Sequence, residues 1–399
     1  MRDYLTILGA GLAGSEAAWQ AAERGVSVVL YEMRPVKPTP AHKTDHCAEL
    51  VCSNSLGNNQ SPSAPYLLKE ELRKFNSLVI DAGDTHAVPA GAALAVDREL
   101  FSKKITEQLL KHPNITLIRE EVTEIPSEGP VIVATGPLTS PRLSESISRL
   151  IGQEYLYFYD AISPIVDANT INYDKTFFAS RYDKGTDDYL NCPLNEGQYY
   201  SLVNELKNGE KVPFKSFEKP IYFEGCMPVE ELAMRGDKTL AFGPLKPVGL
   251  LHPETKEQFY AVVQLRHENK EGTAFNLVGF QTKLTYPEQK RVIRLIPGLE
   301  NAEFFRFGAI HRNTYINAPD VLSCELDLKK NSGIYFAGQI IGVEGYVESV
   351  SMGLLAALSA VKRIKGEVYS TPPVDTALGS LLKYVTETRR QSFQPMNIN

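Results

Sequence analysis

The N-terminal part of the chain alternates between compact apolar runs and a helical pattern. Tyr4 to Leu8 forms one apolar run and Val26 to Tyr31 forms another. Between them, small apolar residues recur at helical spacing, at Ala17, Ala18, Ala21 and Ala22. Two buried strands joined by a helix are typical of a β-α-β unit, whose strands run parallel. The pattern therefore predicts the start of a parallel α/β sheet.

Similar patterns return near the end of the chain, after a middle segment of different character. We expect further strands at 115–118, 131–134 and 333–338, and helices at 67–79, 97–110 and 349–365. A polar, proline-punctuated stretch from Pro35 to Pro65 predicts a long functional loop. The middle segment is rich in tyrosine and phenylalanine and contains strand-like runs such as Phe275 to Phe280. We predict a Rossmann-like α/β domain made of residues 1–145 and 311–399, with a mixed α+β domain inserted over residues 146–310.

Composition places the chain among ordinary globular proteins. It has 399 residues, of which 43% are hydrophobic and 23% charged. The most apolar run, Ser349 to Val361, is too short for the ~20 residues that cross a bilayer. The N-terminus leads directly into the first strand without the pattern of a secretory leader. We therefore expect no membrane segment and a cytoplasmic location.

The net charge of −6 would repel a polyanion, so binding of a nucleic acid would need a local basic face. Basic residues gather in the last third of the chain, although a solvated surface is the ordinary explanation for each group. The candidates are Lys283, Lys290, Arg291, Arg294, Arg306, Arg312, Lys362, Arg363, Lys365, Arg389 and Arg390.

Five cysteines, an odd number without CxxC spacing, argue against a disulfide framework and favour free thiols. Cys52 lies in Val51-Cys-Ser-Asn-Ser55, where hydroxyl, amide and backbone donors could stabilise a thiolate. His42, His46, Cys47 and Cys52 could instead bind zinc, or form an ordinary loop, but their spacing fits no standard zinc motif, so we predict no metal site. Cys226 lies in a turn bounded by glycine and proline, and this local sequence by itself favours a buried structural cysteine.

The strongest local motif is a dinucleotide fingerprint. Gly9-Ala-Gly-Leu-Ala-Gly14 follows a strand and opens a helix, and Glu32 ends the next strand, where it could accept a hydrogen bond from a ribose hydroxyl. Such a turn presents backbone amides and a helix N-terminus to a pyrophosphate. The predicted contacts are Gly9, Ala10, Gly11, Leu12, Ala13, Gly14 and Glu32. A later segment with Gly338 and Gln339 favours FAD over NAD, and Thr135 and Gly136 are expected to close over the same cofactor.

These features occur together with several more specific motifs. They include Ala95-Val-Asp-Arg98, Glu224-Gly-Cys226, Gly243-Pro-Leu-Lys-Pro-Val-Gly249, His311-Arg-Asn313 and Gly342-Val-Glu-Gly-Tyr-Val-Glu-Ser349. Over essentially its whole length the chain resembles the family of folate- and FAD-dependent tRNA (uracil-5-)-methyltransferases. The resemblance implies a glutathione-reductase-like FAD-binding domain. It also implies transfer of a one-carbon unit from 5,10-methylenetetrahydrofolate to C5 of an RNA uridine, with reduction by FADH2 that NADH or NADPH renews.

The resemblance also assigns roles to residues. Cys226 becomes the nucleophile that adds to uracil C6, and Cys52 handles the methylene on flavin N5 or the proton that leaves C5. A free thiol is only a few per cent ionised at pH 7, so we expect neighbours that lower its pKa. Tyr346 is expected near the isoalloxazine, His311 on the pterin, and Tyr286 as an aromatic platform where the family has tryptophan.

Three alternatives stay open at this point. The target is expected to be the T-loop uridine of tRNA, but some relatives act on 23S rRNA. Enzymes that modify the wobble uridine share the cofactors, although they are longer and give no reason for the two cysteine motifs. A non-catalytic FAD- and RNA-binding protein is the third reading. The sequence predicts no oligomeric state.

Overall fold

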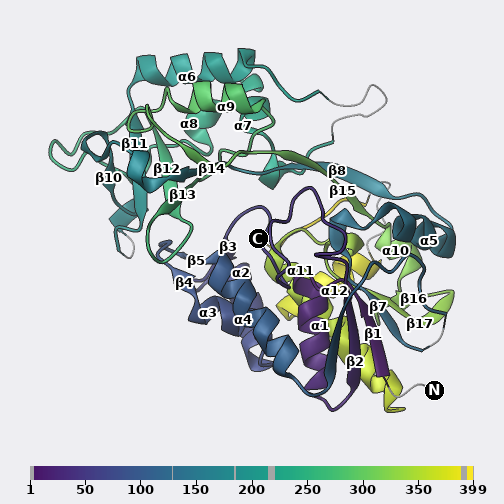
Figure 1. Cartoon of the computed structure of the whole chain (residues 1–399). Helices are drawn as coiled ribbons and strands as arrows, with labels where there is room; N and C mark the ends of the chain where they lie inside the picture. The colour runs from purple at the N-terminus through teal and green to yellow at the C-terminus, as the bar shows by residue number, and fades with distance from the viewer. Residues whose placement is uncertain (1–3, 128, 184–185, 214–220, 388–392, 399) are drawn as a thin grey trace.

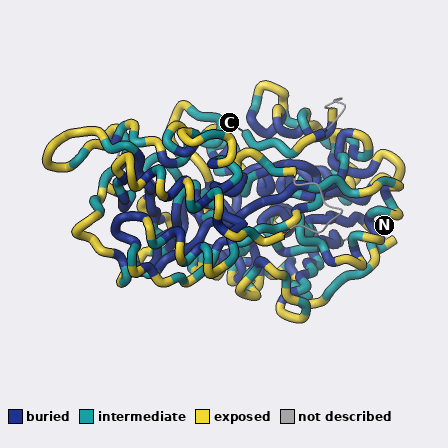
Figure 2. Tube along the Cα trace, turned by 90° about the horizontal axis from the view of Figure 1, so that it is seen from above, coloured by how far each residue is buried: buried dark blue, intermediate teal, exposed yellow. Residues whose placement is uncertain are grey.

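The computed structural model describes residues 4–127, 129–183, 186–213, 221–387 and 393–398. Figure 1 shows two bodies joined by a pair of long strands, with both ends of the described chain in the same body. Figure 2 shows that the buried segments run through the interior of each body and that exposed turns surround them. Every helix among the described residues falls short of the length or apolar character that a membrane crossing needs.

The first body contains a six-stranded sheet in the order β16-β17-β7-β1-β2-β6. Pairs from β17 to β6 are parallel, and β16 joins its edge antiparallel. Its strands are β1 (Tyr4–Leu8), β2 (Ser27–Glu32), β6 (Ile115–Arg119), β7 (Val131–Val133), β16 (Asp327–Leu328) and β17 (Asn331–Phe336). The parallel α/β sheet predicted from the apolar runs is therefore confirmed, and its strands come from both ends of the chain.

Two helices pack closely over this sheet. Helix α1 (Leu12–Ala22) crosses α11 (Tyr346–Ile364), and a Cβ on Gly353 would lie only 2.2 Å from the carbonyl oxygen of Ala13. Only a residue without a side chain allows this approach. Both helices begin at the carboxyl edge of the sheet, where ligands bind in open α/β folds.

A smaller subdomain follows the β1-α1-β2 unit. It contains strands β3 (Ser55–Asn58), β4 (Ala87–Val88) and β5 (Ala93–Val96) and helices α2 (Ala64–Lys74), α3 (Leu78–Thr85) and α4 (Arg98–Lys111). The single helix predicted over 67–79 is wrong. Asn76 has φ of 53°, which ends α2, and the Ser77 hydroxyl accepts a hydrogen bond from Ile80 N to begin α3. The predicted loop from Pro35 to Pro65 also contains β3.

The second body is an antiparallel sheet in the order β10-β11-β12-β13-β9-β14. Helices α6 (Glu196–Asn208), α7 (Val229–Met234), α8 (Thr239–Phe242) and α9 (Tyr286–Ile293) lie along one side of it in Figure 1. Its core includes Tyr199, Leu202 and Phe275. The strands are β9 (Ile165–Asp167), β10 (Phe177–Phe178), β11 (Tyr189–Leu194), β12 (Ala261–His267), β13 (Ala274–Leu277) and β14 (Phe304–Arg306).

A two-stranded antiparallel ribbon connects the bodies. The chain leaves the first body through β8 (Leu156–Ala161) and returns through β15 (Ile310–Tyr315), with Asp160 opposite His311. The predicted boundary at 145/146 lies inside α5 (Pro141–Ile151), and the boundary at 310/311 lies inside β15. The boundaries stay predictions, whereas the ribbon marks where the chain crosses. Helices α10 (Ala318–Val321) and α12 (Ala377–Glu387) complete the first body.

Candidate functional site

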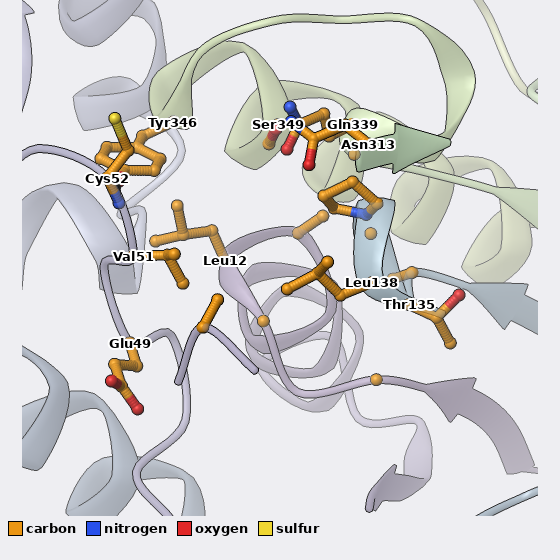
Figure 3. A pocket seen from close by; sticks show the side chains of 18 of the residues that line it. Leu12, Glu49, Val51, Cys52, Thr135, Leu138, Asn313, Gln339, Tyr346 and Ser349 are labelled. Atoms are coloured by element: carbon orange, nitrogen blue, oxygen red, sulfur yellow. Dashed lines mark hydrogen bonds between the residues drawn. The ribbon is translucent and has the colours of Figure 1, made fainter. Parts of the chain in front are cut away.

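A cavity of about 490 Å³ opens at the carboxyl edge of the parallel sheet, a size typical of ligand sites. It has two parts. We call the part around the glycine turn and Glu32 the cofactor end, and the part around Cys52, Asp160 and Cys226 the thiol end. Figure 3 shows Cys52 and Tyr346 on one side of the cavity and Thr135 and Leu138 on the other.

The glycine turn of the cofactor end is tightly packed. Gly9 has φ of +94°, and a Cβ there would lie 2.7 Å from the carbonyl oxygen of Ala134. A Cβ on Gly14 would lie 1.8 Å from the carbonyl oxygen of Gly9. Gly9 therefore permits the turn, and Gly14 lets α1 sit directly on the end of β1.

Glu32 fixes the far wall of the cofactor end. Its carboxylate accepts hydrogen bonds from Ala10 N at 3.0 Å and from the Arg34 guanidinium at 2.9 Å. Burial opposes ionisation of Glu32, but Arg34 and the amide donors outweigh it and lower the pKa of this carboxyl. Glu32 is therefore an ionised acceptor on the cavity wall, and its hydrogen bond with a ribose hydroxyl stays a prediction.

Two helix N-termini open into the same cavity. The N-cap residues of α1 and α11 are Gly11 and Gly345, which have no side-chain oxygen to accept from the first-turn amides. Such amides, together with the helix dipole, favour an anionic ligand such as a pyrophosphate. The arrangement suits a dinucleotide cofactor. Other predicted contacts that line the cavity are Leu12, Ala13, Thr135, Gly136, Gly338 and Gln339.

Tyr346 holds the loop that carries Cys52. Its phenol oxygen accepts hydrogen bonds from Cys52 N at 2.8 Å and from Ser53 N at 3.1 Å. Burial raises the pKa of Tyr346, so the phenol stays neutral. Tyr346 thus lines the cavity and sets the position of the Cys52 loop, and its place near the isoalloxazine stays a prediction.

Arg98 of α4 and Arg266 of the second body hold the same loop from the other side. Arg98 pairs with Glu268 at 2.5 Å and donates to the carbonyl oxygen of Cys52 at 3.0 Å. Arg266 donates to the Ser53 hydroxyl at 2.7 Å and to the Asn54 amide oxygen at 2.9 Å. Ser53 and Asn54 were expected to stabilise a thiolate at Cys52. Their side chains turn to Arg266 instead, and the Cys52 thiol donates to the carbonyl oxygen of Ala161 at 3.8 Å.

Three segments meet at the thiol end. The Sγ atoms of Cys52 and Cys226 and a carboxylate oxygen of Asp160 all lie within 4.8 Å of one another. Tyr222 forms a parallel bridge with Tyr159, which brings the turn η5 (Glu224–Cys226) beside β8. The two cysteines, 174 positions apart in the sequence, are therefore brought together.

The neighbours of Cys226 differ from the expected ones. The Cys52 side chain, burial and the Asp160 carboxylate all raise the pKa of the Cys226 thiol well above its usual value. The expectation of neighbours that lower this pKa is wrong for Cys226, because those that act on it are acidic or apolar. The resting sulfur is a protonated thiol and needs a base before it can attack.

The remaining predicted residues divide into two groups. His311 lines the cavity, and burial together with Arg306 and Lys43 lowers the pKa of its imidazole, which keeps the ring neutral. Tyr286 lies outside this cavity, at the start of α9, where it is 57% exposed and stacks on Phe307. A role for Tyr286 in binding stays a prediction.

The residues of the zinc alternative do not converge. His42 bonds to the Thr39 hydroxyl and His46 to the Ser102 hydroxyl, while Cys47 is fully buried. In the part of the chain that the structure describes, the one group of three metal-type ligands is Cys52, Asp160 and Cys226.

Several of the basic candidates form ion pairs within the second body. Lys290 and Arg294 pair with Glu303, and Arg291 pairs with Glu288. Arg312 lies over the ring of Tyr157, 4.3 Å from its centroid. Arg389 and Arg390 lie outside the described residues.

Sequence reasoning missed two acidic residues of the site. Asp160 interrupts an apolar run in β8, and a charge inside a buried strand was the available signal. Glu344 occurs in a quoted motif but received no role. It lines the cavity, and burial with nearby Asp160 raises the pKa of its carboxyl well above the usual value.

Comparison with known proteins identifies the family of this chain. Residues 4–368 match the family model described as glucose inhibited division protein A. A Natranaerobius thermophilus protein named methylenetetrahydrofolate--tRNA-(uracil-5-)-methyltransferase TrmFO is 60% identical, over 99% of this chain and 91% of that protein. Proteins of the same name from Heliobacterium modesticaldum and Citrifermentans bemidjiense are each 57% identical, and they match 99% and 100% of this chain and 90% and 92% of their own lengths.

Solved structures agree on the fold. GidA from Aquifex aeolicus, in its form II crystal, superposes with a TM-score of 0.75 over 99% of this chain and 69% of that one, at 17% identity. This likeness supports the α/β fold with additional sheets. The chain belongs to the glucose inhibited division protein A family and, within it, to the group of methylenetetrahydrofolate--tRNA-(uracil-5-)-methyltransferases called TrmFO.

Proposed function

We propose that this protein methylates C5 of a uridine in tRNA, with the one-carbon unit taken from 5,10-methylenetetrahydrofolate. Its 60% identical relative carries the name of that activity. The observation that supports it in this chain is the placement of the Cys52 and Cys226 sulfurs together in a cavity that also suits a dinucleotide.

The cofactor end fits FAD. The open amides of α1 would bind the pyrophosphate, and Glu32 would accept from the ribose. Thr135, Gly136, Gly338 and Gln339 would line the remainder of the FAD site. FAD, reduced by NADH or NADPH, would supply the electrons that convert a methylene into a methyl group.

The thiol end fits the chemistry of uracil. C5 of uracil is a poor nucleophile until a sulfur adds at C6 and turns C5 into an enolate carbon. We assign that addition to Cys226. Cys52 either handles the one-carbon unit or accepts the proton that leaves C5. Tyr346 positions the Cys52 loop, and the neutral ring of His311 can stack on the pterin of the folate.

The proposed target is the T-loop uridine of tRNA, and the cellular location that follows is the cytoplasm, where tRNA and the reduced nicotinamides meet.

The test is formation of 5-methyluridine in a tRNA transcript. FAD-loaded enzyme, NADH or NADPH, methylenetetrahydrofolate and tRNA should yield the product by mass spectrometry, and Cys226→Ala should abolish it. Cys324→Ala is the matched control, since Cys324 is exposed and does not line the cavity, and its activity should stay within about twofold of wild type. Unchanged product from Cys226→Ala would remove the assigned nucleophile.

RNA that contains 5-fluorouridine separates target from mechanism. With methylenetetrahydrofolate present, attack of Cys226 on C6 followed by alkylation of C5 should give a complex that survives denaturation. Fluorine at C5 cannot leave as a proton, so the C5–C6 double bond cannot re-form and expel the sulfur. A complex with tRNA and none with 23S rRNA fragments is the expected result, and the reverse would move the target to rRNA.

A further inference from the structure

We propose that Asp160 is a catalytic residue that accepts the thiol proton of Cys226 as the sulfur attacks the uridine, and returns it when the sulfur leaves. The proposal rests on the function proposed above and adds a base that the cysteine pair by itself does not supply.

The geometry puts one carboxylate directly at the reacting sulfur. Asp160 is 9% exposed, lines the cavity and has a carboxylate oxygen within 4.8 Å of both sulfurs. Its Oδ1 is buried and has no hydrogen-bond partner among the residues that the structure describes. An unpaired buried carboxylate oxygen costs free energy, so its retention beside a nucleophile indicates a use.

The surroundings of Asp160 make it a base of suitable strength. The titratable groups around it are the thiols of Cys226 and Cys52, the Glu344 carboxyl, the Tyr346 phenol and the imidazole of His311, which is paired with Asp160 across the ribbon. All are neutral or anionic, because the pKa of His311 is lowered. Burial raises the pKa of Asp160 to about 6, and Cys226, Asn313 and the Ala161 amide offset part of that effect. Asp160 is then ionised at neutral pH and more basic than an ordinary carboxylate.

The charges of the pair explain why the proton moves only during attack. The thiolate of Cys226 beside an ionised Asp160 would place two negative charges together, which is unfavourable at this distance. When the S–H bond breaks, the proton goes to Asp160, the S–C6 bond forms and the C5–C6 electron pair moves toward the C4 oxygen. One negative charge passes from Asp160 to the uracil enolate. After C5 has been alkylated, its proton leaves to water, the C5–C6 double bond re-forms as the S–C6 bond breaks, and Asp160 returns its proton to the sulfur.

Glu344 is another buried acid that lines this cavity, and its hydrogen bonding differs from that of Asp160. Its carboxylate accepts a hydrogen bond from the Gln339 amide at 2.6 Å, whereas Asp160 Oδ1 has no such partner in the described chain. Because Glu344 belongs to the site, the matched control is Glu16→Gln, which also removes one buried acid but lies outside the lining of the cavity.

The experiment compares two rates in FAD-loaded enzyme. A chelator is present throughout, so that no metal ion binds to the two sulfurs and the carboxylate. The first is covalent complex formation with tRNA that contains 5-fluorouridine, in the presence of methylenetetrahydrofolate and NADH or NADPH. The second is alkylation of Cys226 by iodoacetamide in the enzyme without RNA. Asp160→Asn should slow complex formation by about 10²–10⁴-fold, whereas Glu16→Gln should change it by less than about tenfold. The same Asp160→Asn change should speed alkylation or leave it unchanged, because removal of the carboxylate charge lowers the pKa of the thiol.

Slower complex formation without slower alkylation is the signature of a proton acceptor, and a loss of both rates would contradict the proposal. If Asp160→Asn leaves complex formation within threefold of wild type or speeds it, the proposal is overturned. Asp160→Glu should recover part of the rate. A wild-type enzyme that forms no complex would instead refute the proposed function.

A measurement on the wild type tests the proposal even if the Asp160 variants fail to fold. The rate of complex formation should fall as pH decreases through about 6, because a protonated Asp160 cannot accept the thiol proton. A rate that is flat from pH 5 to pH 7 would contradict the proposal without any substitution.

Discussion

The two ends of the cavity are built in different ways. The cofactor end comes from a short continuous stretch, in which Gly9, Gly14 and Glu32 belong to one β-α-β unit. The thiol end is assembled from Cys52, Asp160 and Cys226, which belong to three distant segments held in place by the ribbon and by the second body. A continuous motif can be recognised from spacing, whereas an assembled site depends on contacts between domains. Substitutions at the two ends should therefore differ in what they disrupt.

The largest effect on stability is expected for the ion pair of Arg98 with Glu268, which joins the two bodies and which we call the clamp. Arg98→Met removes the partner of Glu268, whose side chain is only 6% exposed, and leaves that carboxylate without its ion pair. Breaking such a buried pair costs about 3–5 kcal/mol. Chemical denaturation should report this loss, and iodoacetamide should label Cys52 faster because its loop is released.

An exposed pair provides the control for this clamp. Arg149 and Glu124 are each 69% exposed, so Arg149→Met should cost less than about 1 kcal/mol. Equal losses for Arg98→Met and Arg149→Met would mean that the clamp does not hold the thiol end. A second variant, Arg98→Met with Glu268→Leu, should recover part of the stability, because no unpaired charge is left.

The difference between the two ends also explains what the sequence could predict. The turn at Gly9, the acid at Glu32 and the parallel strands follow from local spacing, and the structure places them as expected. The nearness of Cys52 and Cys226 came only from the family resemblance. Asp160 was missed because its partner is set by the bridge between Tyr159 and Tyr222, a contact between segments more than 60 residues apart. The expected neighbours of Cys226 were wrong for the same reason.

The cofactor end can be disrupted separately by Gly14→Ala. The new Cβ would lie 1.8 Å from the backbone oxygen of Gly9, so α1 must move away from β1. We expect a loss of about 3 kcal/mol and at least a roughly tenfold rise in the Kd for FAD, since the amides that face the pyrophosphate move with the helix.

Gly11→Ala is the matched control for that prediction. A Cβ on Gly11 would meet nothing within 4 Å, so stability without FAD should stay within about 0.5 kcal/mol of wild type. Differential scanning calorimetry with and without FAD separates the two effects. A Gly14→Ala protein that binds FAD as tightly as wild type would show that the fingerprint is not the cofactor site.

The smallest effect is expected from Tyr346→Phe, which acts where the two ends meet. It removes the oxygen that accepts from Cys52 N and Ser53 N but keeps the ring in the cavity. Leaving these amides unpaired should cost about 1–2 kcal/mol, and FAD binding should change little because the ring remains. Tyr286→Phe, at a position 57% exposed, is the control and should change the free energy of unfolding by no more than about 0.5 kcal/mol.

Because Tyr346 binds the Cys52 loop and not the glycine turn, Tyr346→Phe should alter the rate of Cys52 alkylation more than the Kd for FAD. The opposite order would mean that the two ends of the cavity form one cooperative unit.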